Sequence, residues 1–116
     1  MATLGVGQYL VPFTPINFSS NGDNTVIAGV AGKTIRVLSI FFKVQAAVNI
    51  TFKDGASNAL TGAMPFAAFD SLTFDFRSGP TVLEPFPWFE TAPGNAFVMN
   101  LSVGTQVSGT VYFTQT

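Results

Sequence analysis

The chain has 116 residues, enough for one domain with a single hydrophobic core. Its net charge is −1 and its five basic residues are scattered, which excludes nucleic acid and anionic membrane surfaces as expected partners, because both need several basic side chains on one face. Only 9% of the residues are charged, against roughly 25% in an ordinary soluble domain, so we expect part of the apolar surface to contact other subunits, with a compact monomer coated by hydroxyls and amides as the alternative.

The first residues predict an extended segment without a helix. An extended piece is expected over residues 8–13, and Pro12 and Pro15 suit an edge or an arm because proline has no N–H to donate to a ladder. Residues 1–20 are therefore predicted to be an N-terminal arm or edge strand, and residues 21–116 the β-sandwich domain. No basic segment precedes the apolar stretch, so we do not expect a secretory signal.

The middle of the chain predicts three strands and one ambiguous stretch. The longest strand is apolar on both faces, which predicts that it is covered on both sides or lies at an interface. The next strand alternates cleanly, with Val48, Ile50 and Phe52 pointing inward. The strands are expected over residues 25–30, 34–44 and 48–53, and residues 59–68 fit either a strand or a loop.

Four more strands are predicted in the second half, again with alternating apolar and polar residues. Gly109 interrupts the apolar row of the last strand and indicates a bulge. The expected strands cover residues 71–77, 88–91, 96–103 and 106–114. The side chains expected to point inward are Leu72, Phe74, Phe76, Phe97, Met99, Leu101, Val103, Val107, Val111 and Phe113.

About eight such strands, each with one apolar face to bury, predict an all-β protein: a single-domain antiparallel β-sandwich. Eight strands also permit a jelly roll, and we expect a jelly-roll-like fold. The order of the strands in the sheets does not follow from the alternation.

The residue types exclude most catalytic chemistry. The chain has no histidine and no cysteine, so the usual zinc and copper ligands and the Ser-His-Asp and Cys-His constellations are missing. A carboxylate pair would need two acids facing one cleft, but Asp70 and Asp75 are expected on opposite faces of one extended segment. We therefore predict that the protein is not an enzyme and has no catalytic residue, metal or cofactor.

Two groups of aromatic and apolar residues are candidate binding sites. In the uncharged N-terminal stretch, the candidate contact residues suit an arm that orders against a neighbouring subunit; the alternative is the outer strand of the sandwich. After a proline-rich loop, a second group could form a sugar-stacking platform or a protein hot spot, unless Trp88 closes one end of the core. The first group is Tyr9, Phe13, Ile16 and Phe18, and the second is Phe86, Trp88 and Phe89.

Several phrases of the sequence resemble a pattern frequent in small virion proteins of tailed bacteriophages. They are AAVNITFKDG at 46–55, ALTGAMP at 59–65, WFETAPG at 88–94, MNLS at 99–102 and QVSGT at 106–110. The resemblance spans roughly residues 32–114, and the first 30 residues match less well.

The resemblance implies a small β-sandwich that decorates or cements the capsid as a small oligomer, often a trimer. Its partners would be copies of itself and the major capsid protein or another virion protein. Such a protein is made in the host cytoplasm and resides on the capsid surface. The alternative is a tail or fibre accessory module that recognises a host-surface glycan or another virion protein.

Overall fold

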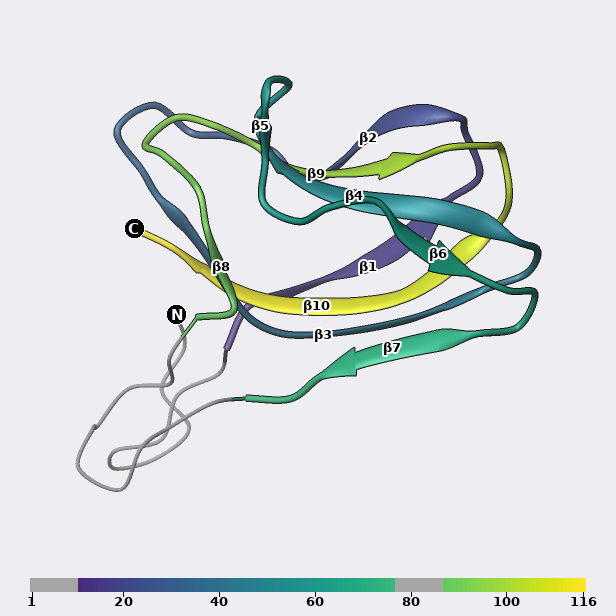
Figure 1. Ribbon diagram of the computed structural model, residues 1–116. Coiled ribbons are helices and arrows are strands. Elements are labelled where there is room, and N and C mark those ends of the chain that lie inside the picture. Colours follow the sequence, from purple (N-terminus) through teal and green to yellow (C-terminus); the bar gives the residue numbers. More distant parts are fainter. Residues whose placement is uncertain (1–10, 77–86) are drawn as a thin grey trace.

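The computed structural model describes residues 11–76 and 87–116. The described chain consists of strands and loops that form two antiparallel sheets packed face to face (Figure 1). The predicted all-β, single-domain sandwich is confirmed. These residues form no helix, and therefore none that could cross a membrane.

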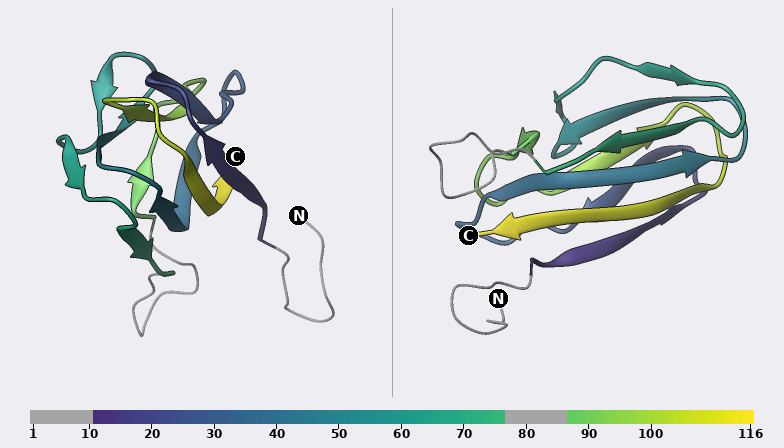
Figure 2. Two further views of the ribbon diagram at one scale, coloured as in Figure 1. Left: turned by 90° about the vertical axis from the view of Figure 1, so that its right-hand side faces the viewer. Right: turned by 90° about the horizontal axis from the view of Figure 1, so that it is seen from below.

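Each sheet has five strands, and all pairings between them are antiparallel. The first sheet has the order β1 (Phe13–Phe18), β10 (Val107–Gln115), β3 (Ile35–Val44) and β7 (Ser71–Phe74). The short strand β8 (Phe89–Glu90) pairs with the beginning of β3. The second sheet has the order β2 (Gly22–Ile27), β9 (Phe97–Leu101), β4 (Val48–Asp54) and β5 (Asn58–Ala59), with β6 (Met64–Phe66) also on β4. Figure 2 shows the four main strands of the first sheet side by side.

The strand order is that of a jelly roll. The chain passes from one sheet to the other at β1 to β2, β2 to β3 and β3 to β4, and again at β6 to β7, β8 to β9 and β9 to β10. The orders β1-β10-β3-β7 and β2-β9-β4-β6 therefore interleave the two halves of the chain. The predicted jelly-roll-like fold is confirmed. β8 is the strand expected over residues 88–91, shortened to two residues, and β5 and β6 are short strands beyond the expected eight.

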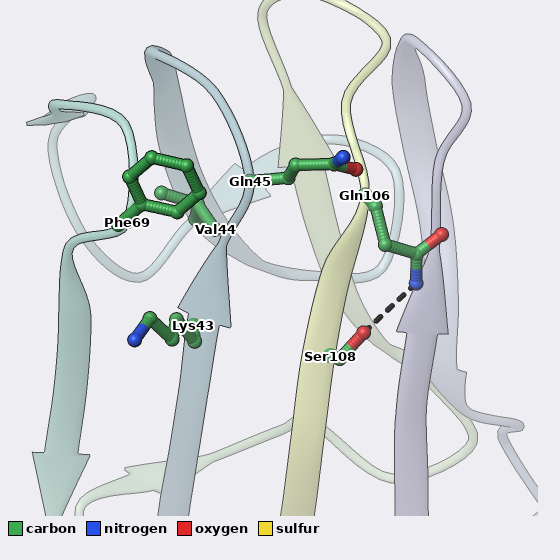
Figure 3. A pocket seen from close by; sticks show the side chains of 6 residues that line it. All are labelled: Lys43, Val44, Gln45, Phe69, Gln106 and Ser108. Carbon is green, nitrogen blue, oxygen red and sulfur yellow. Dashed lines mark hydrogen bonds between the residues drawn. The ribbon is translucent and has the colours of Figure 1, made fainter.

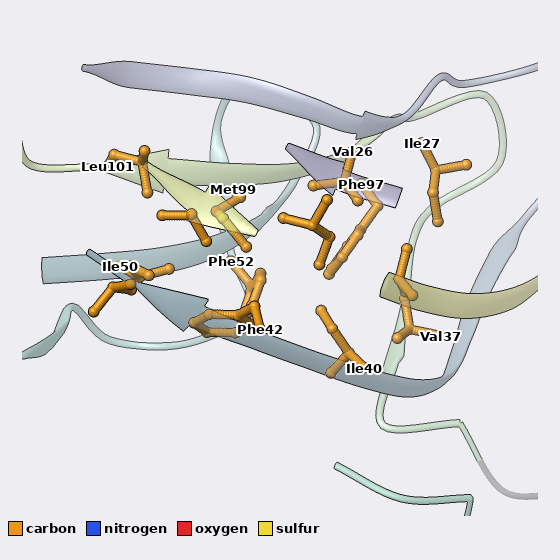
Figure 4. Close-up of a cluster of buried hydrophobic side chains, with 14 of the residues drawn as sticks. Val26, Ile27, Val37, Ile40, Phe42, Ile50, Phe52, Phe97, Met99 and Leu101 are labelled. Carbon is orange, nitrogen blue, oxygen red and sulfur yellow. The ribbon is translucent and has the colours of Figure 1, made fainter. Parts of the chain in front are cut away.

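The core lies between the sheets, where alternate residues of the long strands face one another (Figure 4). Phe42 of β3 meets Phe52 of β4 edge to face, with ring centroids 6.0 Å apart, and Phe52 stacks on Phe97 of β9 at 5.4 Å. All three side chains are fully buried. Contacts of this kind between aromatic rings are worth about 0.5–1.5 kcal/mol each beyond the area that they bury. The inward alternation predicted for residues 48–53 is confirmed.

The bulge lies elsewhere than predicted. Gly109 pairs regularly with Phe42, whereas the register of β10 against β3 shifts between Tyr112 and Phe113 and leaves Leu38 as the extra residue. A glycine is required at position 109 for a different reason, because a Cβ there would overlap the carbonyl oxygen of Phe41. The glycine therefore marks a close approach of two backbones.

Two residues predicted to point inward are exposed. Phe76 is 49% and Val103 48% exposed, because β7 already ends at Phe74 and β9 at Leu101. The strand expected over residues 25–30 begins earlier, at Gly22, whose φ of 92° starts it from a left-handed position. The ambiguous residues 59–68 contribute to two short strands, β5 and β6, which both pair with β4.

The N-terminal segment forms an edge strand from Phe13 onward, and residues 1–10 lie outside the described chain. The backbone N–H of Phe113 donates to the carbonyl of Pro12 (3.1 Å). β1 is the first strand in its sheet, and no strand of the described residues pairs with its outer edge, here called the free edge. Because backbone groups alternate in direction along a strand, Pro15 turns its nitrogen toward this free edge. A proline is tolerated there, and the free edge lacks a donor at that position.

Candidate interaction surfaces

The outer face of the second sheet is polar. Lys53 forms an ion pair with Asp23 at 3.1 Å, and the amide of Asn100 donates to the same carboxylate at 2.7 Å. The hydrogen bond from Asn100 is the main cause that lowers the pKa of Asp23, with a further contribution from Lys53. Thr25 and Thr51 lie on the same face. This sheet is covered by the hydroxyls, amides and charges that a solvated surface needs.

The outer face of the first sheet is aromatic. Phe13, Phe41 and Phe76 are 59%, 47% and 49% exposed. Tyr112 lies among them, with its ring centroid 5.6 Å from that of Phe13 and 5.6 Å from that of Phe76. Phe13 and Tyr112 sit directly opposite each other on β1 and β10, at a pair without mutual hydrogen bonds, where side chains approach most closely. We call these four residues the aromatic face.

Charged residues lie at the ends of the aromatic face. Lys43 pairs with Ser71 at one end of β3 and β7, and Phe41 pairs with Thr73. Asp75 follows Thr73 by two residues and is exposed. Within residues 11–76 and 87–116, neither Lys43 nor Asp75 belongs to an ion pair. A basic residue within β3 and an acidic residue just beyond β7 therefore lie on either side of the Phe41–Thr73 pair along the strand direction.

The predicted N-terminal contacts do not lie on one surface. Phe13 belongs to the aromatic face, whereas Ile16 is 1% exposed and Phe18 packs against the core. Tyr9 lies outside the described residues. The alternation of β1 separates Phe13 from Ile16 and Phe18, because neighbouring side chains point to opposite sides of a sheet.

Three members of the aromatic face were not predicted from the sequence as contact residues, namely Phe41, Phe76 and Tyr112. The signal for Phe41 was in the sequence, since its strand is apolar on both faces. Nothing in the local sequence indicated that Tyr112 lies between Phe13 and Phe76, because this arrangement depends on which strands pair and in which register.

The predicted aromatic patch around Trp88 is divided in a similar way. Trp88 is half-buried, stacks on Phe74 at 4.5 Å, and donates its indole N–H to the carbonyl of Asp75 at 2.6 Å. The ring centroid of Phe89 lies 5.3 Å from that of Phe52 and 5.8 Å from that of Phe97, so Phe89 belongs to the core. Phe86 lies outside the described residues. Trp88 and Phe89 thus lie over one end of the core.

A shallow hollow of about 250 Å³ opens at the end of β3 and β10 (Figure 3). Gln106 holds its side chain there by donating to Ser108 at 2.9 Å and to Asn17 at 2.7 Å. The hollow is lined by Lys43, Val44, Gln45, Phe69, Gln106 and Ser108.

Phe69 beside this hollow has a strained backbone. Its φ is 68°, and its ring is 69% exposed. The Phe69 N–H donates to the carbonyl of Val44 at 2.9 Å, and the Val44 N–H donates to the carbonyl of Asp70 at 2.9 Å. A non-glycine residue held in this region costs about 1–3 kcal/mol, and such residues concentrate at functional sites.

The described residues contain no group of three or more metal-ligating side chains. Every buried side-chain nitrogen or oxygen atom among them has a hydrogen-bond partner. Comparisons with protein families, with curated proteins and with solved structures return no match to this chain. The surfaces themselves, and the sequence resemblance, therefore carry the functional argument.

Proposed function

We propose that the protein is a non-enzymatic viral structural protein that decorates or cements a phage capsid as a small oligomer. The observation that carries the assembly part is the contrast between the two outer faces of the sandwich. One face bears Asp23, Lys53 and Asn100, and the other bears exposed phenylalanines. The virion part rests on the sequence resemblance, and jelly rolls are common in viral capsid proteins.

Energetics support the assembly role. Full burial of a phenylalanine side chain is worth about 1.5–3 kcal/mol, so each half-exposed ring leaves roughly 1 kcal/mol to be gained in an interface. Aromatic residues are enriched in the buried centres of protein interfaces, whereas charged residues are depleted there. The aromatic face has this composition, with Lys43 and Asp75 near its ends.

The test uses purified protein and virions of the phage that carries the gene. We expect sedimentation to show a small closed oligomer, and electron microscopy of virions with labelled protein to show regular sites on the head. Phe41→Ser should weaken virion binding or self-association at least tenfold, whereas Thr25→Ser on the polar face should leave both unchanged. A monomer that ignores virions at micromolar concentration would overturn the proposal.

The hollow beside Phe69 favours a second candidate, a tail or fibre module that binds a host-surface glycan. An exposed aromatic ring next to the amides of Gln45 and Gln106 offers a stacking surface and hydrogen-bonding groups for a sugar. Phe69→Gly separates function from folding, because glycine adopts a φ of 68° without strain.

On this second candidate, the Phe69→Gly variant should unfold at the same or a higher denaturant concentration than the parent and lose glycan binding. Binding is measured on an array of bacterial surface glycans. Labelling of tail tips in virions would separate this candidate from the first, and an array without a single hit that depends on Phe69 would contradict it.

A further inference from the structure

We infer that the aromatic face binds a second copy of the chain in a two-fold, face-to-face contact, with Phe41 close to the axis. The inference rests on the proposed assembly role and names the first partner in it. Its observations are the free edge of β1, the placement of two charges on either side of Phe41, and the area of the face.

The free edge of β1 does not favour pairing strand to strand. Pro15 turns toward that edge and has no N–H, so a second β1 cannot form a complete ladder there. Exposed apolar residues instead gather on the outer surface of the same sheet. A second copy would therefore bind through the face and not through the edge.

The charges make this face complementary to itself. Lys43 of β3 and Asp75, one residue beyond the end of β7, lie on opposite sides of the pair formed by Phe41 and Thr73. A two-fold axis in the plane of the interface, perpendicular to the strands and passing near Phe41, reverses the strand direction. It brings Lys43 of each copy toward Asp75 of the other. One operation thus creates two ion pairs around a centre of aromatic rings.

The size of the face sets the expected strength. From strand spacing and rise per residue, β1, β10, β3 and β7 together cover roughly 500 Å². Two such faces would bury about 1,000 Å² in total, at the lower end of specific interfaces. We therefore expect a micromolar dimer in which each ion pair has a measurable effect.

A contact of this kind is closed by two copies. It predicts a dimer, or a larger assembly built from dimers, in place of the trimer that the sequence resemblance implies. A measured mass therefore distinguishes the two.

The experiment is a charge reversal followed by analytical ultracentrifugation of the full chain over a range of concentrations. Lys43→Glu and Asp75→Lys should each raise the dimer dissociation constant at least tenfold, because like charges then face each other twice. The double variant should restore the parent value to within about threefold. Asp75→Lys leaves the carbonyl that accepts the indole N–H of Trp88 in place.

Lys33→Glu is the control, because it makes the same change of charge on an exposed turn away from the face. It should leave the dissociation constant unchanged. Single reversals without effect, or a double variant as weak as the singles, would overturn the inference. A trimer that binds virions would also overturn it and leave the proposed function standing, whereas a monomer that ignores virions would remove both.

Discussion

Gly109 of β10 lies against the carbonyl oxygen of Phe41 on β3, with no room for a Cβ between the two backbones. This contact lies in the middle of the first sheet, where β10 is flanked by β1 and β3. The same strand segment of β3 carries Phe42 into the core and Phe41 onto the aromatic face. The packing of β10 against β3 and the placement of Phe41 on the outer face therefore both depend on the glycine at position 109.

Gly109→Ala should destabilise the domain by about 1–3 kcal/mol, the usual cost of forcing extra atoms into a packed site. The matched control is Gly62→Ala, because a Cβ at Gly62 would have no heavy atom within 4 Å apart from those of Gly62 and its two chain neighbours. Urea unfolding followed by tryptophan fluorescence measures both. Equal midpoints for the two variants would contradict the close approach of β10 to β3.

Phe42 and Phe41 are neighbours in sequence with opposite surroundings. Phe42→Ala should lower the free energy of unfolding by about 3–5 kcal/mol, because its ring is 1% exposed and contacts Phe52. Phe41→Ala should cost under about 1 kcal/mol, since its ring is already half in water. Unfolding is measured at submicromolar protein, so that association does not contribute. A reversed order of the two costs would mean that the faces of β3 are assigned the wrong way round.

The carboxylate of Asp23 links stability to pH. Its pKa lies below the ordinary 3.8 chiefly because of the hydrogen bond from Asn100. A depressed pKa contributes stability that is present above the unfolded value and is lost as pH falls through the folded pKa. Asn100→Ala should therefore raise the pKa of Asp23 toward 3.8 and reduce the loss of stability in acid. A carbon-detected NMR titration of the carboxyl measures this, with the exposed Asn49→Ala as a control that leaves the pKa of Asp23 unchanged.

Trp88→Ala should destabilise the domain by about 2 kcal/mol, because it removes a stacked ring and an indole hydrogen bond. Trp88→Phe keeps a ring on Phe74 and should recover part of that loss. Thermal unfolding by circular dichroism measures both, since tryptophan fluorescence is lost in these variants. Parent-like stability of Trp88→Ala together with lost glycan binding would instead assign Trp88 to a binding site.

The alternation of apolar and polar residues predicted the inner side of the long strands. Ile50 and Phe52 are buried as expected, because a strand turns successive side chains to opposite faces whatever its partner is. The ends of strands were predicted less well. Phe76 and Val103 continue the apolar pattern, yet they lie beyond the last residue that pairs with a neighbouring strand. A strand ends where its partner ends, and the partner does not follow from local sequence.

The sequence by itself determined an all-β sandwich with a nearly uncharged surface, since composition and period-two alternation are local properties of the chain. Only the tertiary structure decided which strands are neighbours. It therefore also decided that Phe13, Phe41, Phe76 and Tyr112 share one surface and that Pro15 faces a free edge. Strand pairing joins segments from both ends of the chain, and the free energy that selects one pairing comes from the packing of the whole core.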